Sequence, residues 1–192
     1  TGGPIIRDWT SVGLATEVTA TALTLTIGTT YVIGVRVQNG AGLFSADSFS
    51  DGILVDTTQP SDVTVTDEGA TTTSTTTLHA TWSASSDPES GITDYQYLIR
   101  RDSTTGAIMV TFTSVGLVTE VTRTGLSLTN GTTYFIGVQA KNGAGLFSAV
   151  RYADGILVQA DVTPPTGSIT ISDHAPYTTS QEVTLTLSAT DE

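Results

Sequence analysis

Residues 126–143 read LSLTNGTTYFIGVQAKNG, and this stretch decides the fold. It contains a turn signal, Asn130-Gly131, and then continues as an alternating run. Every second residue of that run is apolar: Tyr134, Ile136, Val138 and Ala140. A period of two is typical of a β-strand that buries one face. The stretch therefore predicts a half-buried strand that follows a tight turn.

The same stretch occurs a second time in the chain. Residues 11–55 align without gaps on residues 114–158, and 32 of the 45 aligned pairs are identical. Shared runs such as NGAGLFSA exclude a mere similarity of strand composition. A fainter copy of the linker is also present, because residues 56–60 (DTTQP) resemble residues 161–165 (DVTPP). The chain therefore contains an internal repeat with a period of roughly 103–106 residues.

This period divides the chain into three predicted parts. Residues 1–56 correspond to the back part of one repeat, residues 57–161 to a complete repeat, and residues 162–192 to the front part of another. The first residue is Thr1 rather than Met, and we expect the chain to be a window on a longer tandem array.

Strand signals dominate the complete repeat. Short alternating runs, such as residues 78–82 and 95–99, are separated by turns rich in Gly, Asn and Ser, and no run of ten residues has a helical stripe. Thr and Val suit such strands because their β-branched side chains pack well on a pleated surface. The predicted fold class is all-β: tandem antiparallel β-sandwiches with about seven strands in the complete repeat.

One spacing resembles a known family. Leu128 precedes Tyr134 by six residues with a Gly between them, and Leu25 precedes Tyr31 in the same way. This resembles the tyrosine corner of fibronectin type III modules. The resemblance implies a fibronectin type III-like sandwich with Trp82 as its core tryptophan. The implied core residues are Trp82, Leu128, Tyr134, Ile136 and Val138. In residues 162–192 Leu187 replaces the tryptophan, so that part resembles either this family or a related immunoglobulin-like repeat.

Composition excludes several classes of protein. The chain has 192 residues with 39 Thr, 18 Ser and no Cys, and 7 basic against 19 acidic residues give a net charge of −12. Binding to nucleic acid through phosphate neutralisation is excluded by the scarcity of cations. Disulfides and thiol-ligated metals are excluded by the absence of Cys. No apolar run is long enough for a membrane helix. We expect an extracellular or cell-surface location.

Acidic residues gather where the repeats are expected to meet. The resemblance places residues 86–91 in a loop at the end that faces the preceding repeat, close to the boundary at residue 56. Carboxylates that converge there suggest Ca²⁺, which takes six to eight oxygen ligands. The alternative is that these residues cap turns and keep the surface soluble. The candidate ligands at the two junctions are Asp56, Asp87, Glu89, Asp161, Asp191 and Glu192. No cofactor is otherwise required.

Three further features have open interpretations. Asn130-Gly131-Thr132 matches the N-glycosylation pattern, yet Asn-Gly also makes a turn by itself. The run Thr71–Thr77 is either O-glycosylated or a polar turn between strands. Apolar residues follow the Asn-Gly-Ala-Gly motif in both copies, where they either contact a neighbouring unit or cover their own sandwich. These candidate interface residues are Leu43, Phe44, Leu146 and Phe147.

The sequence contains no pattern typical of a catalytic site. His79 and His174 lack a nucleophile or carboxylate at a suggestive spacing, so we expect no enzyme. The predicted function is structural: a segment of a long prokaryotic surface or secreted protein, serving as stalk, surface-layer, filament or spacer. The expected partners are neighbouring repeats and, in a filament, other copies. The alternatives are recognition of a glycan or protein through the loops, or a spacer of a large extracellular hydrolase.

Overall fold

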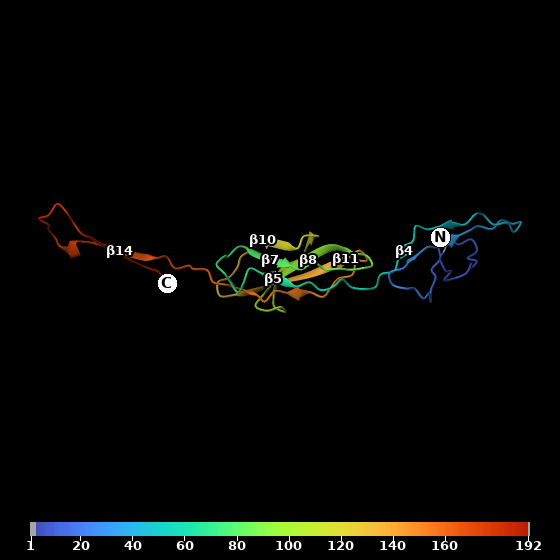
Figure 1. Ribbon diagram of the computed structural model, residues 1–192, viewed down its shortest axis with the longest axis horizontal. Helices are drawn as coiled ribbons and strands as arrows, with labels where there is room; N and C mark the ends of the chain where they lie inside the picture. The colour runs from blue at the N-terminus through green and yellow to red at the C-terminus, as the bar shows by residue number, and fades with distance from the viewer. Residues whose placement is uncertain (1–2, 192) are drawn as a thin grey trace.

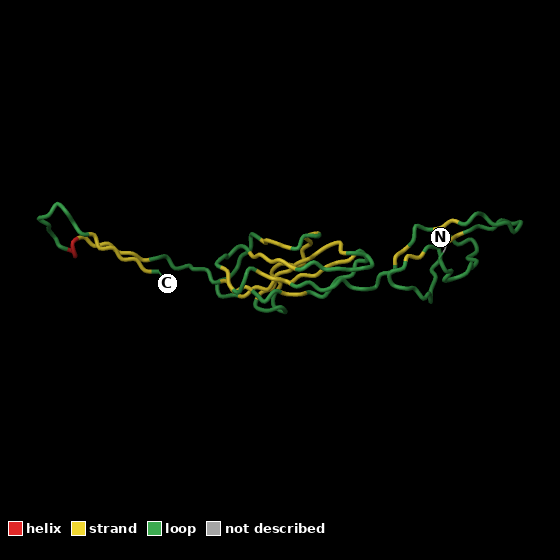
Figure 2. Tube along the Cα trace, viewed as in Figure 1, coloured by secondary structure: helices red, strands yellow, loops and turns green. Residues whose placement is uncertain are grey.

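The computed structural model describes residues 3–191. Figure 1 shows three parts in a row, in which a sandwich at the centre is flanked by an N-terminal segment and a C-terminal hairpin. Strands are concentrated in the central part, whereas the N-terminal flank is mostly loop and the C-terminal flank is a two-stranded hairpin with a loop at its far end (Figure 2). Among the described residues, no helix is long and apolar enough to cross a membrane.

Two sheets form the central sandwich. In the smaller sheet, β7 (Leu78–Trp82) lies between β5 (Val65–Asp67) and β10 (Glu120–Arg123), and both pairings are antiparallel. The larger sheet has the order β6-β13-β11-β8-β9, with β12 also paired to β11. Its strands are β6 (Thr71–Thr72), β8 (Ile92–Arg101), β9 (Ile108–Gly116), β11 (Thr133–Asn142), β12 (Arg151–Tyr152) and β13 (Ile156–Val158). This architecture confirms the prediction of an all-β sandwich.

The segment at residues 65–72 pairs with both sheets, which sequence patterning did not predict. After β5 the chain turns at Gly69, whose φ of +120° favours glycine, and β6 then runs parallel to β13. The Leu157 N–H donates to the Ala70 carbonyl at 2.9 Å. Thr71 and Thr72, expected in a polar turn, are therefore strand residues that pair with the edge of the larger sheet.

The core lies between the two sheets and is built from the inward rows that alternation predicted. All five implied core residues are buried, and the ring of Trp82 lies 6.0 Å from the ring of Tyr95 at a tilt of 56°. The tyrosine corner is present, because the Thr129 N–H donates to Tyr134 Oη at 2.9 Å. Burial of each large apolar side chain stabilises the sandwich by about 1.5–3 kcal/mol.

The N-terminal segment, residues 3–56, keeps the tyrosine-corner hydrogen bond of the central repeat but has shorter strands and no core of its own. Its strands form two small antiparallel pairs, β1 (Thr30–Tyr31) with β4 (Ile53–Leu54) and β2 (Gly34–Val35) with β3 (Ser48–Phe49). Ile33 and Val35 are 63% and 59% exposed, whereas their counterparts Ile136 and Val138 are 1% and 0% exposed. Residues 3–56 have no counterpart of β5, β7 or β8, and this explains the difference.

The C-terminal part is a single antiparallel hairpin. β14 (Thr166–Ile171) pairs with β15 (Leu185–Thr190), and a short 3₁₀ turn, η1 (Ser172–His174), follows β14. Its apolar residues Ile169 and Leu187 lie opposite each other and are exposed.

Candidate functional site

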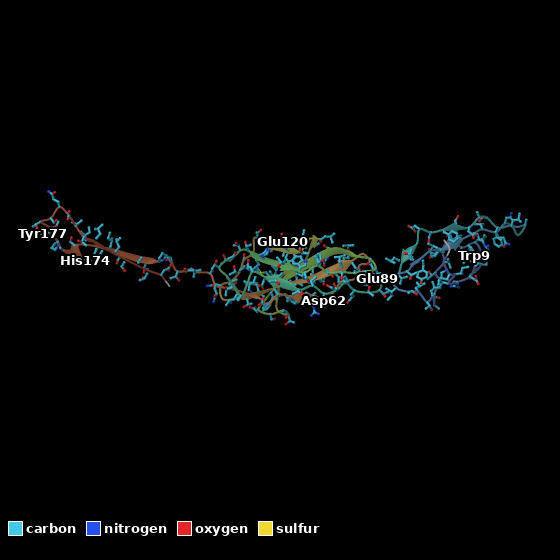
Figure 3. The ribbon with its side chains drawn as sticks, viewed as in Figure 1. Trp9, Asp62, Glu89, Glu120, His174 and Tyr177 are labelled. Carbon is cyan, nitrogen blue, oxygen red and sulfur yellow. The ribbon has the colours of Figure 1, made fainter. Side chains whose placement is uncertain are left out.

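The acidic residues singled out in the sequence meet at one end of the sandwich. Three stretches come together there: the linker at residues 56–60, the β7–β8 loop at residues 83–91, and the β11–β12 loop at residues 143–150, which follows Asn142. In Figure 3, Glu89 lies at the end of the sandwich nearest the N-terminal segment. This is the first junction between repeats.

Asn142 is the centre of the junction. It is the last residue of β11 and is only 1% exposed. Its Nδ2 atom lies 3.0 Å from each of three acceptors: Asp56 Oδ2, Asp87 Oδ2 and the carbonyl of Thr58. Its Oδ1 atom accepts the Leu146 N–H at 2.8 Å. One buried amide therefore joins the linker and both loops.

Asp56 attaches the linker to this amide. Its Oδ1 accepts both the N–H and the hydroxyl of Thr58 at 3.0 Å, and its Oδ2 accepts the hydroxyl of Ser90. Glu89 joins the same group, since the Thr58 hydroxyl lies 3.0 Å from Glu89 Oε2. These carboxylate oxygens accept hydrogen bonds from uncharged donors.

Asp87 is the buried carboxylate of the cluster. Its Oδ1 accepts the Ser90 N–H at 2.9 Å, which caps the turn of the β7–β8 loop. The Ser90 N–H and, secondly, the Asn142 side chain hold the pKa of Asp87 below its ordinary value of 3.8. Asp87 is therefore ionised at neutral pH and holds the loop in place through its charge-assisted hydrogen bonds.

The three acidic residues of this junction lie close enough to share an ion. One ligand atom from each of Asp56, Asp87 and Glu89 falls within 4.8 Å of the others. The nearby Nδ2 of Asn142 is a donor, and it points at two of these carboxylates. Calcium at this position stays a prediction.

The second junction is described only in part. Asp161 accepts the Thr163 N–H at 2.9 Å, in the same local turn that Asp56 makes with Thr58. Asp191 directly follows β15, and Glu192 lies outside the described residues. Calcium at this junction also stays a prediction.

The remaining candidate residues lie on exposed or half-buried loops. Asn130 is exposed, and its Oδ1 accepts the Ala160 N–H at 3.0 Å, so the side chain holds the second linker. Glycosylation of Asn130 stays a prediction. Leu146 and Phe147 are half-buried, and Lys141 Nζ lies 5.5 Å from the Phe147 ring. Leu43 and Phe44 are exposed. The interface function of these four apolar residues stays a prediction.

Sequence reasoning missed Asn142, Ser90 and Thr58, which are the donors of the junction. Asn142 had a usable signal, because it begins the Asn-Gly-Ala-Gly motif that occurs in both copies; Asn39 begins the motif in the first copy. Ser90 and Thr58 had none, since Ser and Thr are common throughout the chain.

Two known proteins are similar to this chain in sequence. Exoglucanase B of Cellulomonas fimi is 34% identical over 169 residues, which cover 86% of this chain and 15% of the exoglucanase. Chitinase A1 of Niallia circulans is 33% identical over 180 residues, which cover 89% of this chain and 24% of the chitinase. The chain thus spans less than a quarter of the length of either relative.

Solved structures of low identity resemble parts of the chain. The chicken CNTN1 FN1–FN3 domains match 70% of this chain and 44% of their own at 21% identity, with a TM-score of 0.42. The twitchin kinase region from C. elegans matches 56% of this chain and 18% of its own at 19% identity, with a TM-score of 0.41.

The family model of the fibronectin type III domain matches residues 58–153, which is half of the chain. This range contains the sandwich from β5 to β12, its tyrosine corner and Asn142. The chain belongs to the fibronectin type III family.

Proposed function

We propose that this chain is a spacer segment of a secreted polysaccharide hydrolase, in which fibronectin type III repeats hold other domains apart. The fibronectin type III domain is a non-catalytic module. The observation that supports a hydrolase is the similarity to an exoglucanase and a chitinase, which spans nearly all of this chain but a small share of each enzyme. A repeated segment of this kind is expected to lie outside the part that performs hydrolysis.

The shape of the chain supports a spacer. The two linkers leave the central sandwich at opposite ends, so successive repeats extend along one axis (Figure 1). A net charge of −12 on 192 residues favours solubility and opposes collapse of neighbouring repeats onto one another. A rod of sandwiches thereby sets a distance between the domains at its ends.

Binding to insoluble polymers tests this function. The 192-residue chain should remain in the supernatant when it is mixed with crystalline cellulose or with chitin, and it should release no reducing sugar from either. Small-angle X-ray scattering of the same sample should give an elongated particle. Retention on one of the polymers would instead support recognition of a glycan.

Recognition is the second candidate function because of one aromatic group. The guanidinium of Arg36 lies 4.2 Å from the ring centroids of both Trp9 and Phe44, and the two rings are 45% and 54% exposed. Exposed aromatic patches often mark binding surfaces. Arg36 already covers one face of each ring, which leaves less of the rings for a sugar to stack on, and we therefore favour the spacer.

The gene context separates the spacer from a stalk, surface layer or filament. A reading frame that joins this segment to a glycoside hydrolase domain would support the proposed function. A frame consisting of sandwich repeats and a cell-wall anchor would contradict it and favour the surface structure.

A further inference from the structure

The first linker is attached to both of the parts that it joins. On the N-terminal side, the Gly28 N–H donates to the Val55 carbonyl at 2.8 Å, and the Val55 N–H donates to the Thr29 carbonyl at 3.0 Å. On the other side, the next residue, Asp56, contacts Asn142 and Ser90 of the central sandwich. A hydrogen-bonded path therefore runs from the turn at residues 26–29 to the end of β11.

The two parts also lie close together beside this path. A Cβ atom placed on Gly28 would lie 3.8 Å from Cγ of Glu89, which is an ordinary van der Waals distance. Gly28 belongs to the N-terminal segment and Glu89 to the β7–β8 loop of the sandwich.

Asn142 has donors that match the linker. Its amide group carries two N–H bonds, and they face the carboxylates of Asp56 and Asp87, which would otherwise repel each other. The amide group is almost fully buried, so water does not readily reach it. The loss of an acceptor would therefore leave an Asn142 N–H without a hydrogen bond, which is unfavourable. The position of Asp56 is therefore coupled to the packing of the sandwich.

The second linker provides an internal comparison. Asp161 makes the same local turn with Thr163 as Asp56 makes with Thr58, and the preceding backbone bonds of Val158 repeat those of Val55. Asp161 is exposed, however, and two extra residues, Gln159 and Ala160, precede it. Within residues 3–191, the local turn at Asp161 thus exists without a buried asparagine against it.

We infer that Asn142 is an orientation lock between repeats, a buried site whose partner is the linker aspartate contributed by the preceding repeat. This inference rests on the proposed spacer function and adds that the spacer is stiff at this junction. Asn39 occupies the same place in the first Asn-Gly-Ala-Gly motif, and its Oδ1 accepts the Leu43 N–H as that of Asn142 accepts the Leu146 N–H. A linker fits the lock when an aspartate lies two residues before a threonine, as in Asp56-Thr57-Thr58.

Amide hydrogen exchange of the 192-residue chain tests the lock. Asp56→Ala should raise exchange about tenfold at amides that Asp56 does not bond, namely those of Ala144 and Leu146 in the β11–β12 loop and Gly28 in the N-terminal turn. These amides donate to Ser90 Oγ, Asn142 Oδ1 and the Val55 carbonyl, respectively, and each bond depends on the locked arrangement. Ser90→Ala should raise exchange less at Leu146 and Gly28, because it removes only one donor to Asp56. Ala144 is left out of this comparison, because Ser90→Ala removes its acceptor directly.

Asp161→Ala is the matched control. It removes the same local turn from the other linker and should raise exchange only at Thr163. The lock is overturned if Asp56→Ala likewise affects Thr58 alone. Thermal unfolding of the sandwich confirms that each variant is folded. Failure of the proposed spacer function would be seen separately. In that case the 192-residue chain would bind cellulose or chitin, while Asp56→Ala would still raise exchange at Leu146 and Gly28.

Discussion

Trp82 is the side chain whose removal most directly tests the core. It is buried in β7 against Tyr95, and among the described residues its Nε1–H is a buried donor with no hydrogen-bond partner. A buried indole removes about 200 Å² from water, which stabilises the fold by about 5 kcal/mol. The unpaired N–H offsets about 1–3 kcal/mol of this gain. Trp82→Ala should therefore cost about 3 kcal/mol, near the lower end of the usual range for a buried aromatic.

The unpaired N–H makes a second variant informative. Trp82→Phe keeps an aromatic ring in the core and removes the unsatisfied donor, so it should cost only about 1 kcal/mol. Differential scanning calorimetry of the 192-residue chain measures both variants. For a sandwich of this size, about 3 kcal/mol lowers the melting temperature by about 12–24 °C.

Trp9→Ala is the matched control for these variants. Trp9 is 45% exposed in the N-terminal segment, so its loss should leave the main transition unchanged. The core assignment is refuted if Trp82→Ala shifts the transition no more than Trp9→Ala does. Equal losses for Trp82→Phe and Trp82→Ala would refute the argument about the unpaired N–H.

Three other outcomes are expected from the geometry. The pKa of Asp87 is lower in the folded state than its ordinary value of 3.8. The ionised carboxylate therefore stabilises the fold above pH 3.8, and this stabilisation is lost as the pH falls through the folded pKa. Asp87→Asn should flatten the acid side of a curve of stability against pH, measured by urea titration. Tyr134→Phe should cost about 1 kcal/mol in the same titrations because the Thr129 N–H loses its acceptor, whereas Tyr31→Phe, which breaks the equivalent bond outside the core, should leave the transition in place. If Ca²⁺ occupies the first junction, a concentration a hundred times its Kd should stabilise the chain by about 2.7 kcal/mol over a chelator, and Glu89→Gln should reduce this gain; an unchanged melting temperature would show that hydrogen bonds alone hold the carboxylates.

The candidate site was predictable in its acidic half only. The position of residues 86–91 in a loop that faces the boundary at Asp56 predicted that Asp56, Asp87 and Glu89 would approach one another, and they do. Asn142 was not predicted because it lies 86 residues from Asp56 and 55 from Asp87, and its local motif also serves as a simple turn. The strand β6 was missed for a similar reason, since its parallel partner β13 is distant in sequence.

The two copies separate local from tertiary effects within one chain. In both copies a tyrosine hydroxyl accepts a hydrogen bond of 2.9 Å from the backbone N–H of the residue five positions earlier. Tyr31 accepts from Thr26, and Tyr134 accepts from Thr129. A serine Oγ likewise accepts a hydrogen bond of 3.0 Å from the backbone N–H of the residue eight positions earlier. Ser45 accepts from Val37, and Ser148 accepts from Ala140. The amino-acid sequence determines these features by itself, because every atom involved comes from one short stretch.

Burial was decided by the tertiary structure alone. Ile53 and Ile156 occupy the same place in the repeat, yet Ile53 is 66% exposed and Ile156 is 0% exposed. Alternation marks both residues as able to face a core, but burial requires a second sheet, and β5 and β7 supply it only to the central repeat. The junction at Asn142 follows the same rule, since its hydrogen bonds form only when folding brings the linker and two distant loops to one end of the sandwich.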